Sequence, residues 1–155
     1  MSKPVESQKY DLVLTRVFDA PRELMFRAWT DPKHLAQWFG PNGFTNPVCE
    51  VDLRPGGVWR HVMHGPDGND YPMTAIFQEV IRPERLVFMC YVPNQENSLF
   101  EILNIATFTE QGGKTKLTFE AKVLKSTPAA APMLAGMKAG WTQSLERLAA
   151  YLAKA

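Results

Sequence analysis

The pattern in this sequence that comes closest to a metal-ligand motif is a pair of histidines three residues apart, His61 and His64. The pair falls in residues 58–64, where apolar and polar side chains alternate as in a β-strand. Residues three apart on a strand point to opposite faces of the sheet, so the two rings cannot share one ion. Asp67 and Asp70 flank a glycine-containing stretch typical of turns, and a calcium site would need further oxygen ligands. We therefore expect no metal and no cofactor.

Acid–base chemistry is the main catalytic option left, because the motifs of nucleophilic and nucleotide chemistry are absent. The sequence has no Gly-x-Ser-x-Gly, no phosphate-binding loop and no Gly-x-Gly-x-x-Gly. His61 and Glu79 are polar residues on strand faces that otherwise look buried, where a polar group must find a partner. They could pair with each other, orient the polar end of an apolar ligand, or act as general acid and base. Glu79 could instead lie at the rim of the sheet, so we assign no catalytic residue.

The composition is that of one ordinary globular domain. The chain has 155 residues, of which 45% are hydrophobic and 21% charged. Its 17 basic and 16 acidic side chains give a net charge of +1, unlike the strongly basic balance of nucleic-acid-binding proteins. No apolar run is long enough to insert into a membrane, and residues 1–6 lack the apolar core of a signal peptide. We expect a soluble, cytoplasmic protein with no nucleic-acid partner and no membrane insertion.

The two cysteines, Cys49 and Cys90, are too few for a disulfide scaffold. We expect them to be free, buried thiols, and one disulfide between them stays open as an alternative.

The hydrophobic pattern predicts strands in the first two thirds of the chain, interrupted by two short helices. Residues 1–9 are polar and are predicted to form a disordered tail, followed by a single domain over residues 10–155. Pro21 and Pro32 each follow a residue pattern that starts a short helix. Short turns between the later apolar runs indicate an antiparallel meander. The predicted strands cover residues 10–18, 48–53, 58–64, 73–81, 85–92, 99–109 and 114–123.

The last part of the chain changes to a helical period. Its apolar residues are spaced 3, 4, 4, 3 and 4 apart, which is one stripe of an amphipathic helix over roughly residues 130 to 153. Such a helix is about 35 Å long and can lie across the whole meander. The predicted fold class is α+β, with a curved antiparallel sheet of about six or seven strands, two short helices, and a long C-terminal helix across the concave face. The stripe comprises Leu134, Met137, Trp141, Leu145, Leu148 and Leu152.

Several short motifs resemble those of a known family, the homologues of the activator of the 90-kDa heat-shock-protein ATPase. This family belongs to the START-like superfamily, which includes polyketide cyclases. The resemblance extends from about Tyr10 to Leu152 and implies the helix-grip fold, but it does not identify a substrate, because such folds host many functions. The motifs are FDAPRE at 18–23, AWTDP at 28–32, DLRPGG at 52–57, PDG at 66–68, PERLVF at 83–88, and Gly140-Trp141 followed by Leu145 and Leu148.

Bulky apolar side chains on the inner strand faces and two glycines on the C-terminal helix suggest a ligand pocket. Gly136 and Gly140 each cost about 1 kcal/mol relative to alanine inside a helix, so something should offset that cost. Either the helix approaches the sheet closely at these glycines, or the missing side chains leave room for a ligand. For each single apolar residue on the strands, the alternative to lining a pocket is plain core packing. The candidate ligand-binding residues are Trp38, Trp59, His61, Met63, Phe77, Glu79, Met137, Gly140 and Trp141.

Three functions are consistent with these features. The first, suggested by START-like relatives, is the binding of a hydrophobic or aromatic small molecule in a cavity between the sheet and the C-terminal helix. The second is a single-domain co-chaperone acting on a heat-shock ATPase, although founding members of the family carry an additional N-terminal domain that nine residues before the first strand cannot provide. The third is a cyclase- or hydrolase-like enzyme on an aromatic or polyketide-like substrate, with His61, Glu79 or Tyr91 displayed in the cavity. A homodimer is left open.

Overall fold

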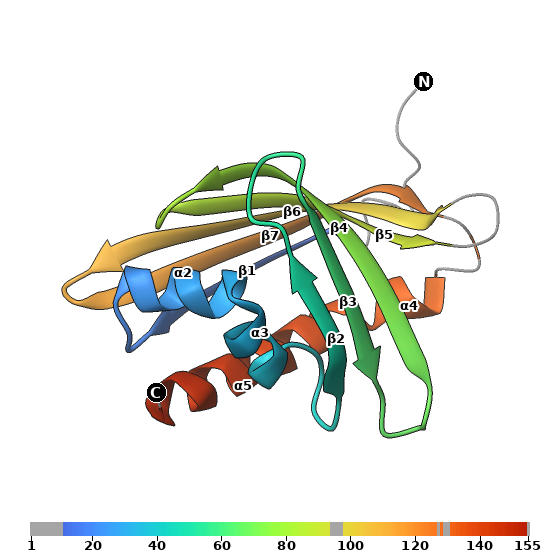
Figure 1. Cartoon of the computed structure of the whole chain (residues 1–155), viewed down its shortest axis with the longest axis horizontal. Helices are drawn as coiled ribbons and strands as arrows, with labels where there is room; N and C mark the ends of the chain where they lie inside the picture. Colours follow the sequence, from blue (N-terminus) through green and yellow to red (C-terminus); the bar gives the residue numbers. More distant parts are fainter. Residues whose placement is uncertain (1–10, 94–97, 127, 129–130, 155) are drawn as a thin grey trace.

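The computed structural model describes residues 11–93, 98–126, 128 and 131–154, and the predicted tail over residues 1–9 lies outside them. Within the described residues, seven antiparallel strands form one sheet in the order β1-β7-β6-β5-β4-β3-β2. Figure 1 shows the sheet curving over α5, with α2 and α3 on the same side as α5. The predicted α+β, helix-grip architecture is confirmed. The elements are β1 (Leu12–Phe18), α2 (Arg22–Thr30), α3 (Pro32–Trp38), β2 (Thr45–Val51), β3 (Val58–His64), β4 (Asp70–Ile81), β5 (Arg85–Pro93), β6 (Ser98–Gln111), β7 (Lys114–Ser126), α4 (Ala131–Ala135) and α5 (Met137–Lys154).

The two short helices begin where the prolines predict. At α3 the side chain of Asp31 accepts a hydrogen bond from the Lys33 backbone N–H at 2.9 Å, and Pro32 takes the first helical position. Both features suit a helix start, since the first amides have no partner within the helix. Just after α3, Gly40 has a φ of +100°, a conformation that side-chain-bearing residues rarely adopt. The glycine turns the chain from α3 toward β2.

The turn between β2 and β3 is held against the second half of β4. The Gly56 N–H donates to the carbonyl of Phe77 at 2.7 Å, and the Phe77 N–H donates to the carbonyl of Gly57 at 3.0 Å. A Cβ at Gly57 would lie 2.0 Å from the carbonyl oxygen of Asp52, so only glycine fits there. The DLRPGG motif is therefore explained by backbone packing.

A dense aromatic core fills the space between the sheet and α2. Trp29 of α2 contacts Trp38 with ring centroids 5.2 Å apart, Phe108 at 5.9 Å and Phe119 at 6.0 Å. The ring of Trp141 from α5 stacks on Trp29 at 5.7 Å, with only 7° between the planes. The predicted inward face of β7 is confirmed, because its four apolar members, Leu117, Phe119, Ala121 and Val123, are all fully buried.

The C-terminal helix differs from the prediction in one respect. It is interrupted at Gly136, which separates the short α4 from α5, and the Gly140 N–H donates to the carbonyl of Gly136 at 2.9 Å. Gly136 therefore marks a break and is not a glycine inside a continuous helix. Leu145, Leu148 and Leu152 are buried as the stripe predicts, whereas Met137 and Trp141 near the break are only partly buried.

Both cysteines are free: Cys49 is partly buried and Cys90 is buried. The disulfide alternative is thus excluded in this structure. In the described part of the chain, no helix combines the length and apolar character needed to cross a membrane.

Candidate functional site

A pocket of about 230 Å³ lies between the sheet and the C-terminal helices, at the break between α4 and α5. Its sheet side comes from β3 to β6 and includes Met63, Met73 and Cys90. Its helix side includes Leu134, Met137, Gly140 and Trp141, and the segment Phe39–Pro41 after α3 closes one flank. Four of the predicted site residues line this pocket, namely Met63, Met137, Gly140 and Trp141.

The surroundings of Gly140 show whether this glycine allows close helix–sheet packing or leaves room for a ligand. A Cβ built on Gly140 would contact only the Cγ of Pro41, at an ordinary 3.6 Å. No described atom of the sheet lies within 4 Å of that position. Close approach of the helix to the sheet is therefore not the reason for this glycine. The missing side chain leaves open space that is part of the pocket.

The flanking segment is tied firmly to α5. The Arg147 side chain donates from Nη1 to three successive carbonyls, those of Phe39 at 3.2 Å, Gly40 at 2.9 Å and Pro41 at 2.9 Å. The Gly40 N–H donates to the hydroxyl oxygen of Ser144 at 3.1 Å. The guanidinium thereby satisfies carbonyls after the end of α3, where a positive charge also favours the helix dipole. This wall of the pocket is fixed in place by hydrogen bonds.

Two buried polar side chains line the otherwise apolar pocket. Asn104 on β6 and Ser144 on α5 are only 2% and 3% exposed. The Asn104 amide nitrogen donates to the carbonyl of Ile102 at 3.0 Å, to the sulfur of Cys90 at 3.2 Å and to the carbonyl of Phe88 at 3.4 Å. Burial raises the pKa of the Cys90 thiol to about 12, although the Asn104 hydrogen bond acts in the opposite direction. Cys90 is therefore a neutral thiol and not a nucleophile at physiological pH.

Asn104 and Ser144 were not predicted as site residues, although the sequence carries a signal for each. Asn104 alternates with Ile102 and Ala106 on the inner face of β6, so it is an amide within an apolar series. Ser144 lies three residues after Trp141 and four before Leu148, on the apolar stripe of the helix. In both cases a polar residue interrupts a buried face.

His61 is buried, but it does not line the pocket. It is 1% exposed, its Nδ1 accepts a hydrogen bond from the Trp59 indole at 3.1 Å, and its Nε2 lies 2.7 Å from the side-chain oxygen of Asn46. An indole can only donate, so Nδ1 is the acceptor and Nε2 carries the proton of a neutral ring. Burial lowers the pKa of His61 to about 4, consistent with that neutral form. Asn46 in turn donates to the carbonyls of Ala36 and Phe39, so His61 links β3 to α3.

The prediction that Glu79 shares the inner face of β4 with Phe77 is wrong. A β-bulge between Phe77 and Glu79 shifts the register, so that Phe77 opposes Phe88 and Glu79 opposes Val87. The extra residue reverses the alternation, and Glu79 lies exposed with its Oε1 3.3 Å from the Nε of Arg85. His61 and Glu79 therefore do not form a pair. The sheet-rim alternative is not what the structure shows either, because β4 is an interior strand and Glu79 pairs with Val87.

Three further candidates, Trp38, Trp59 and Phe77, belong to the closed core and are almost completely buried. Trp38 donates from its indole to the carbonyl of Ala28 at 2.9 Å, which ties α3 to α2. Trp59 contacts Phe88 with centroids 5.0 Å apart. None of the three is among the described residues that line the pocket.

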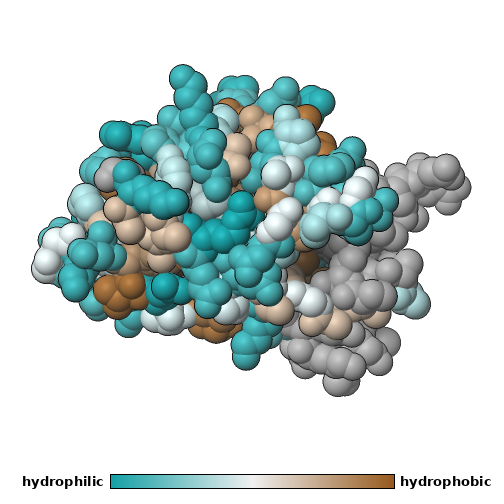
Figure 2. All heavy atoms as spheres, turned by 90° about the horizontal axis from the view of Figure 1, so that it is seen from below, coloured by the Kyte–Doolittle hydropathy of each residue, from teal (hydrophilic) through white to brown (hydrophobic). Residues whose placement is uncertain are grey.

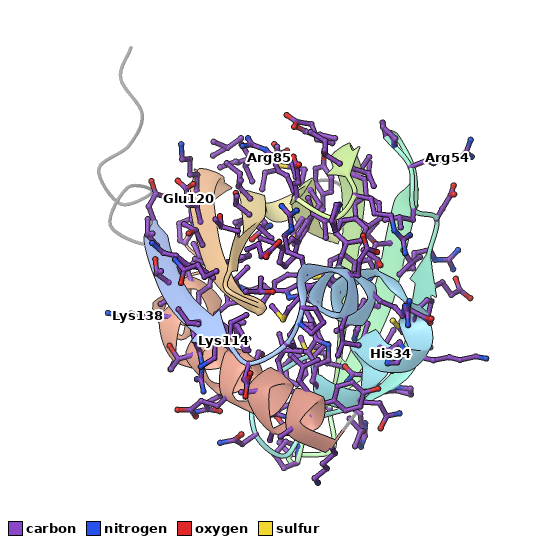
Figure 3. All side chains as sticks on the ribbon, turned by 90° about the vertical axis from the view of Figure 1, so that its left-hand side faces the viewer. His34, Arg54, Arg85, Lys114, Glu120 and Lys138 are labelled. Atoms are coloured by element: carbon purple, nitrogen blue, oxygen red, sulfur yellow. The ribbon has the colours of Figure 1, made fainter. Side chains whose placement is uncertain are left out.

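The charged side chains of the described residues lie outside the pocket. None of the lining residues is charged. Arg54 and Lys138 are exposed and extend away from the layer between the sheet and α5 (Figure 3).

His61 and His64 lie on opposite faces of β3, as predicted, and His64 lies 2.7 Å from Asp70 on the outside. No group of three or more potential ligand side chains capable of holding a metal ion occurs in the described ranges.

Comparison with known proteins places this chain in a family. The family model described as Activator of Hsp90 ATPase homolog 1-like protein matches residues 19–153. A Nitrosomonas europaea protein of known structure, NE0264, is 29% identical with a TM-score of 0.79, covering 98% of this chain and 97% of that chain. The Silicibacter pomeroyi protein titled AHSA1 is 28% identical with a TM-score of 0.75, covering 92% and 97%. Protein Ms6760 from Mycobacterium smegmatis is 27% identical with a TM-score of 0.79, covering 96% and 93%.

A search of the curated proteins finds no match. Since the family model covers most of the sequence and the fold agrees with that of these structures, the chain belongs to the family of Activator of Hsp90 ATPase homolog 1-like proteins.

Proposed function

We propose that this protein binds an apolar or aromatic small molecule in the pocket between the sheet and the C-terminal helices. Family membership supports a ligand-binding or a co-chaperone-like domain, and the pocket favours the first. The observation that carries the proposal is a pocket of about 230 Å³ with largely apolar walls, beside a helix glycine whose missing side chain leaves it open. An apolar cavity of about 150 Å³ can bind benzene, so this pocket has room for a two-ring molecule.

The walls of the pocket suit this role. Trp141 presents an aromatic surface and is itself held by contacts with Phe119, at a centroid distance of 4.1 Å, and with Trp29. Met63, Met73 and Met137 add flexible, polarizable side chains that can adapt to the outline of a guest. A wall fixed in advance reduces the ordering cost of binding, which favours affinity.

Thermal unfolding in the presence of a panel of aromatic, lipid-like and polyketide-like compounds tests the proposal. A ligand at 100 times its dissociation constant adds about 2.7 kcal/mol, which raises the midpoint by roughly 5–10 °C at this chain length. We expect such a shift for one class of uncharged apolar compounds. Gly140→Leu should abolish it by filling the pocket, and Gly140→Ala is the matched control that keeps most of the space. No shift across the panel, or an equal shift in Gly140→Leu, would contradict binding in this pocket.

The co-chaperone alternative has less support from the described surface. Figure 2 shows mainly hydrophilic side chains on the face seen from below in Figure 1, with apolar ones in separate small areas. The exposed large apolar residues of the described ranges are spread over five strands and form no group on α3 or α5: Val13, Val17, Val48, Val58, Ile81 and Leu124. A protein-docking face usually shows a contiguous apolar patch.

The enzymatic alternative also lacks a site in the described residues. It requires His61, Glu79 or Tyr91 in the cavity, and none of the three is among the lining residues.

A further inference from the structure

Asn104 and Ser144 each have one polar group without a hydrogen-bond partner in the described part of the chain. A ligand in the pocket has to complement these two groups. The Asn104 amide group faces the carbonyls of Phe88 and Ile102, so that end must be the NH₂ donor and the other end the oxygen. Among the hydrogen bonds of the described residues, none reaches the Asn104 oxygen. Asn104 lines the pocket, so a ligand there can donate a hydrogen bond to this oxygen.

Ser144 offers the opposite group. Its hydroxyl oxygen accepts from the Gly40 N–H at 3.1 Å, and within the described ranges its own hydrogen has no acceptor. The other phenolic or hydroxyl group at the pocket, that of Tyr71, already donates to Asp67. The pocket thus presents one free acceptor on the sheet and one free donor on the helix.

The absence of charge among the lining residues restricts the ligand further. A carboxylate placed here would lose its hydration with no cation among the described lining residues to compensate. It would also face the Asn104 oxygen, which cannot donate a hydrogen bond. Arg147, whose side chain is bonded to the flanking segment of the pocket, already uses Nη1 for the carbonyls of Phe39, Gly40 and Pro41.

We propose that the pocket selects uncharged aromatic alcohols, with the ligand hydroxyl donating to the Asn104 oxygen and accepting from the Ser144 hydroxyl. This specificity rests on the proposed function, because it assigns the polar contacts of the same pocket. It excludes aromatic carboxylates of the same size and makes Asn104 and Ser144 the residues that determine specificity.

Three probes with the same two-ring body test the selection. At neutral pH 2-naphthol is uncharged and both donates and accepts, 2-methoxynaphthalene only accepts, and 2-naphthoate is an anion. We would titrate each into ¹⁵N-labelled protein and follow the Gly140 amide and Trp141 indole signals, which report the pocket itself. We expect 2-naphthol to bind about tenfold more tightly than 2-methoxynaphthalene, the effect of one net hydrogen bond. We expect 2-naphthoate to bind at least about a hundredfold more weakly than 2-naphthol.

Two variants assign the contacts. Asn104→Leu removes the acceptor while keeping the branched shape of the side chain, and it should reduce 2-naphthol affinity about tenfold while leaving 2-methoxynaphthalene unchanged. Ser144→Ala removes the donor and should weaken both of these ligands. If Asn104→Leu fails to fold after losing its bonds to Ile102 and Phe88, Ser144→Ala and the ranking of the three probes on the unaltered protein still decide the matter.

The outcomes separate this inference from the proposed function. If the probes bind in the pocket with equal affinity, or if 2-naphthoate binds most tightly, the specificity is wrong and apolar binding stands. If none of the three binds but another compound of the panel does, the assignment of aromatic alcohols is overturned and the proposed function stands. If neither the probes nor the panel perturb the Gly140 and Trp141 signals, the proposed function itself fails.

Discussion

The space between the sheet and the helices has two halves that are built from similar residues and packed differently. Under α2, the rings of Trp29, Phe108 and Phe119 meet at centroid distances of 5.9 to 6.0 Å and leave almost nothing exposed. Under the break between α4 and α5, a glycine and partly buried methionines surround a pocket of about 230 Å³. Trp141 stands at the boundary, stacked on Trp29 and facing the pocket. The difference suggests that the closed half supports the open one.

The strongest test of this comparison is to damage the closed half. We expect Trp29→Ala to reduce the free energy of unfolding by about 3–5 kcal/mol, because it removes a fully buried ring on which four other aromatic rings rest. Urea titration measures the loss. Met137→Ala, in the wall of the pocket, is the control and should cost clearly less. Equal losses in the two variants would show that the halves are packed alike.

His61 gives the closed half a dependence on pH. Burial lowers the folded pKa of His61 to about 4, below its ordinary value of 6.5, so below pH 6.5 the unfolded chain binds a proton that the folded protein does not. Stability is therefore fully present above about pH 6.5 and falls by about 1.4 kcal/mol per pH unit below it, reaching a loss of about 3 kcal/mol near pH 4.

Urea titrations from pH 7.5 to 5 would measure this slope, before most carboxylates titrate. His61→Gln should flatten the slope in this range, whereas His64→Gln, on the exposed face of β3, serves as the control. A slope that survives in His61→Gln would place the responsible group elsewhere.

The smallest expected effect is a gain of stability in the open half. Gly140→Ala should raise the free energy of unfolding by up to about 1 kcal/mol, because alanine is the better helix former and its methyl group meets only Pro41 at 3.6 Å. Thermal and urea unfolding of the two proteins measure the gain. A destabilised Gly140→Ala would indicate close packing at this position, and the pocket as described would then be wrong.

The order of strands and helices could be predicted well from the sequence, because local hydrophobic periodicity distinguishes the two. The bounds of β3 agree with the predicted residues 58–64, and α3 begins at the predicted Pro32. The break at Gly136 was missed, since the apolar stripe continues across it and only the backbone is interrupted. Glu79 was misplaced because the bulge in β4 reverses which face of the sheet the following residues occupy, and the sequence does not mark where a bulge lies.

The candidate site was predicted less completely, for a different reason. An apolar residue that fills a core and one that borders a hollow look the same in a sequence, so Trp59 and Phe77 were grouped with Met63 and Met137. The role of His61 depends on Asn46, fifteen residues away on another strand, and no local pattern reveals that partner. Asn104 and Ser144 carried a visible signal, a polar residue on an apolar face, that was read only for His61 and Glu79.

The position of Trp141 gives the protein a built-in optical probe. The chain has four tryptophans, and Trp29, Trp38 and Trp59 are almost inaccessible to solvent, whereas Trp141 is partly buried and lines the pocket. An uncharged quencher such as acrylamide should therefore reach the Trp141 indole far more readily than the other three. A molecule that occupies the pocket would shield this one indole, so the fraction of quenchable fluorescence reports occupancy without any label.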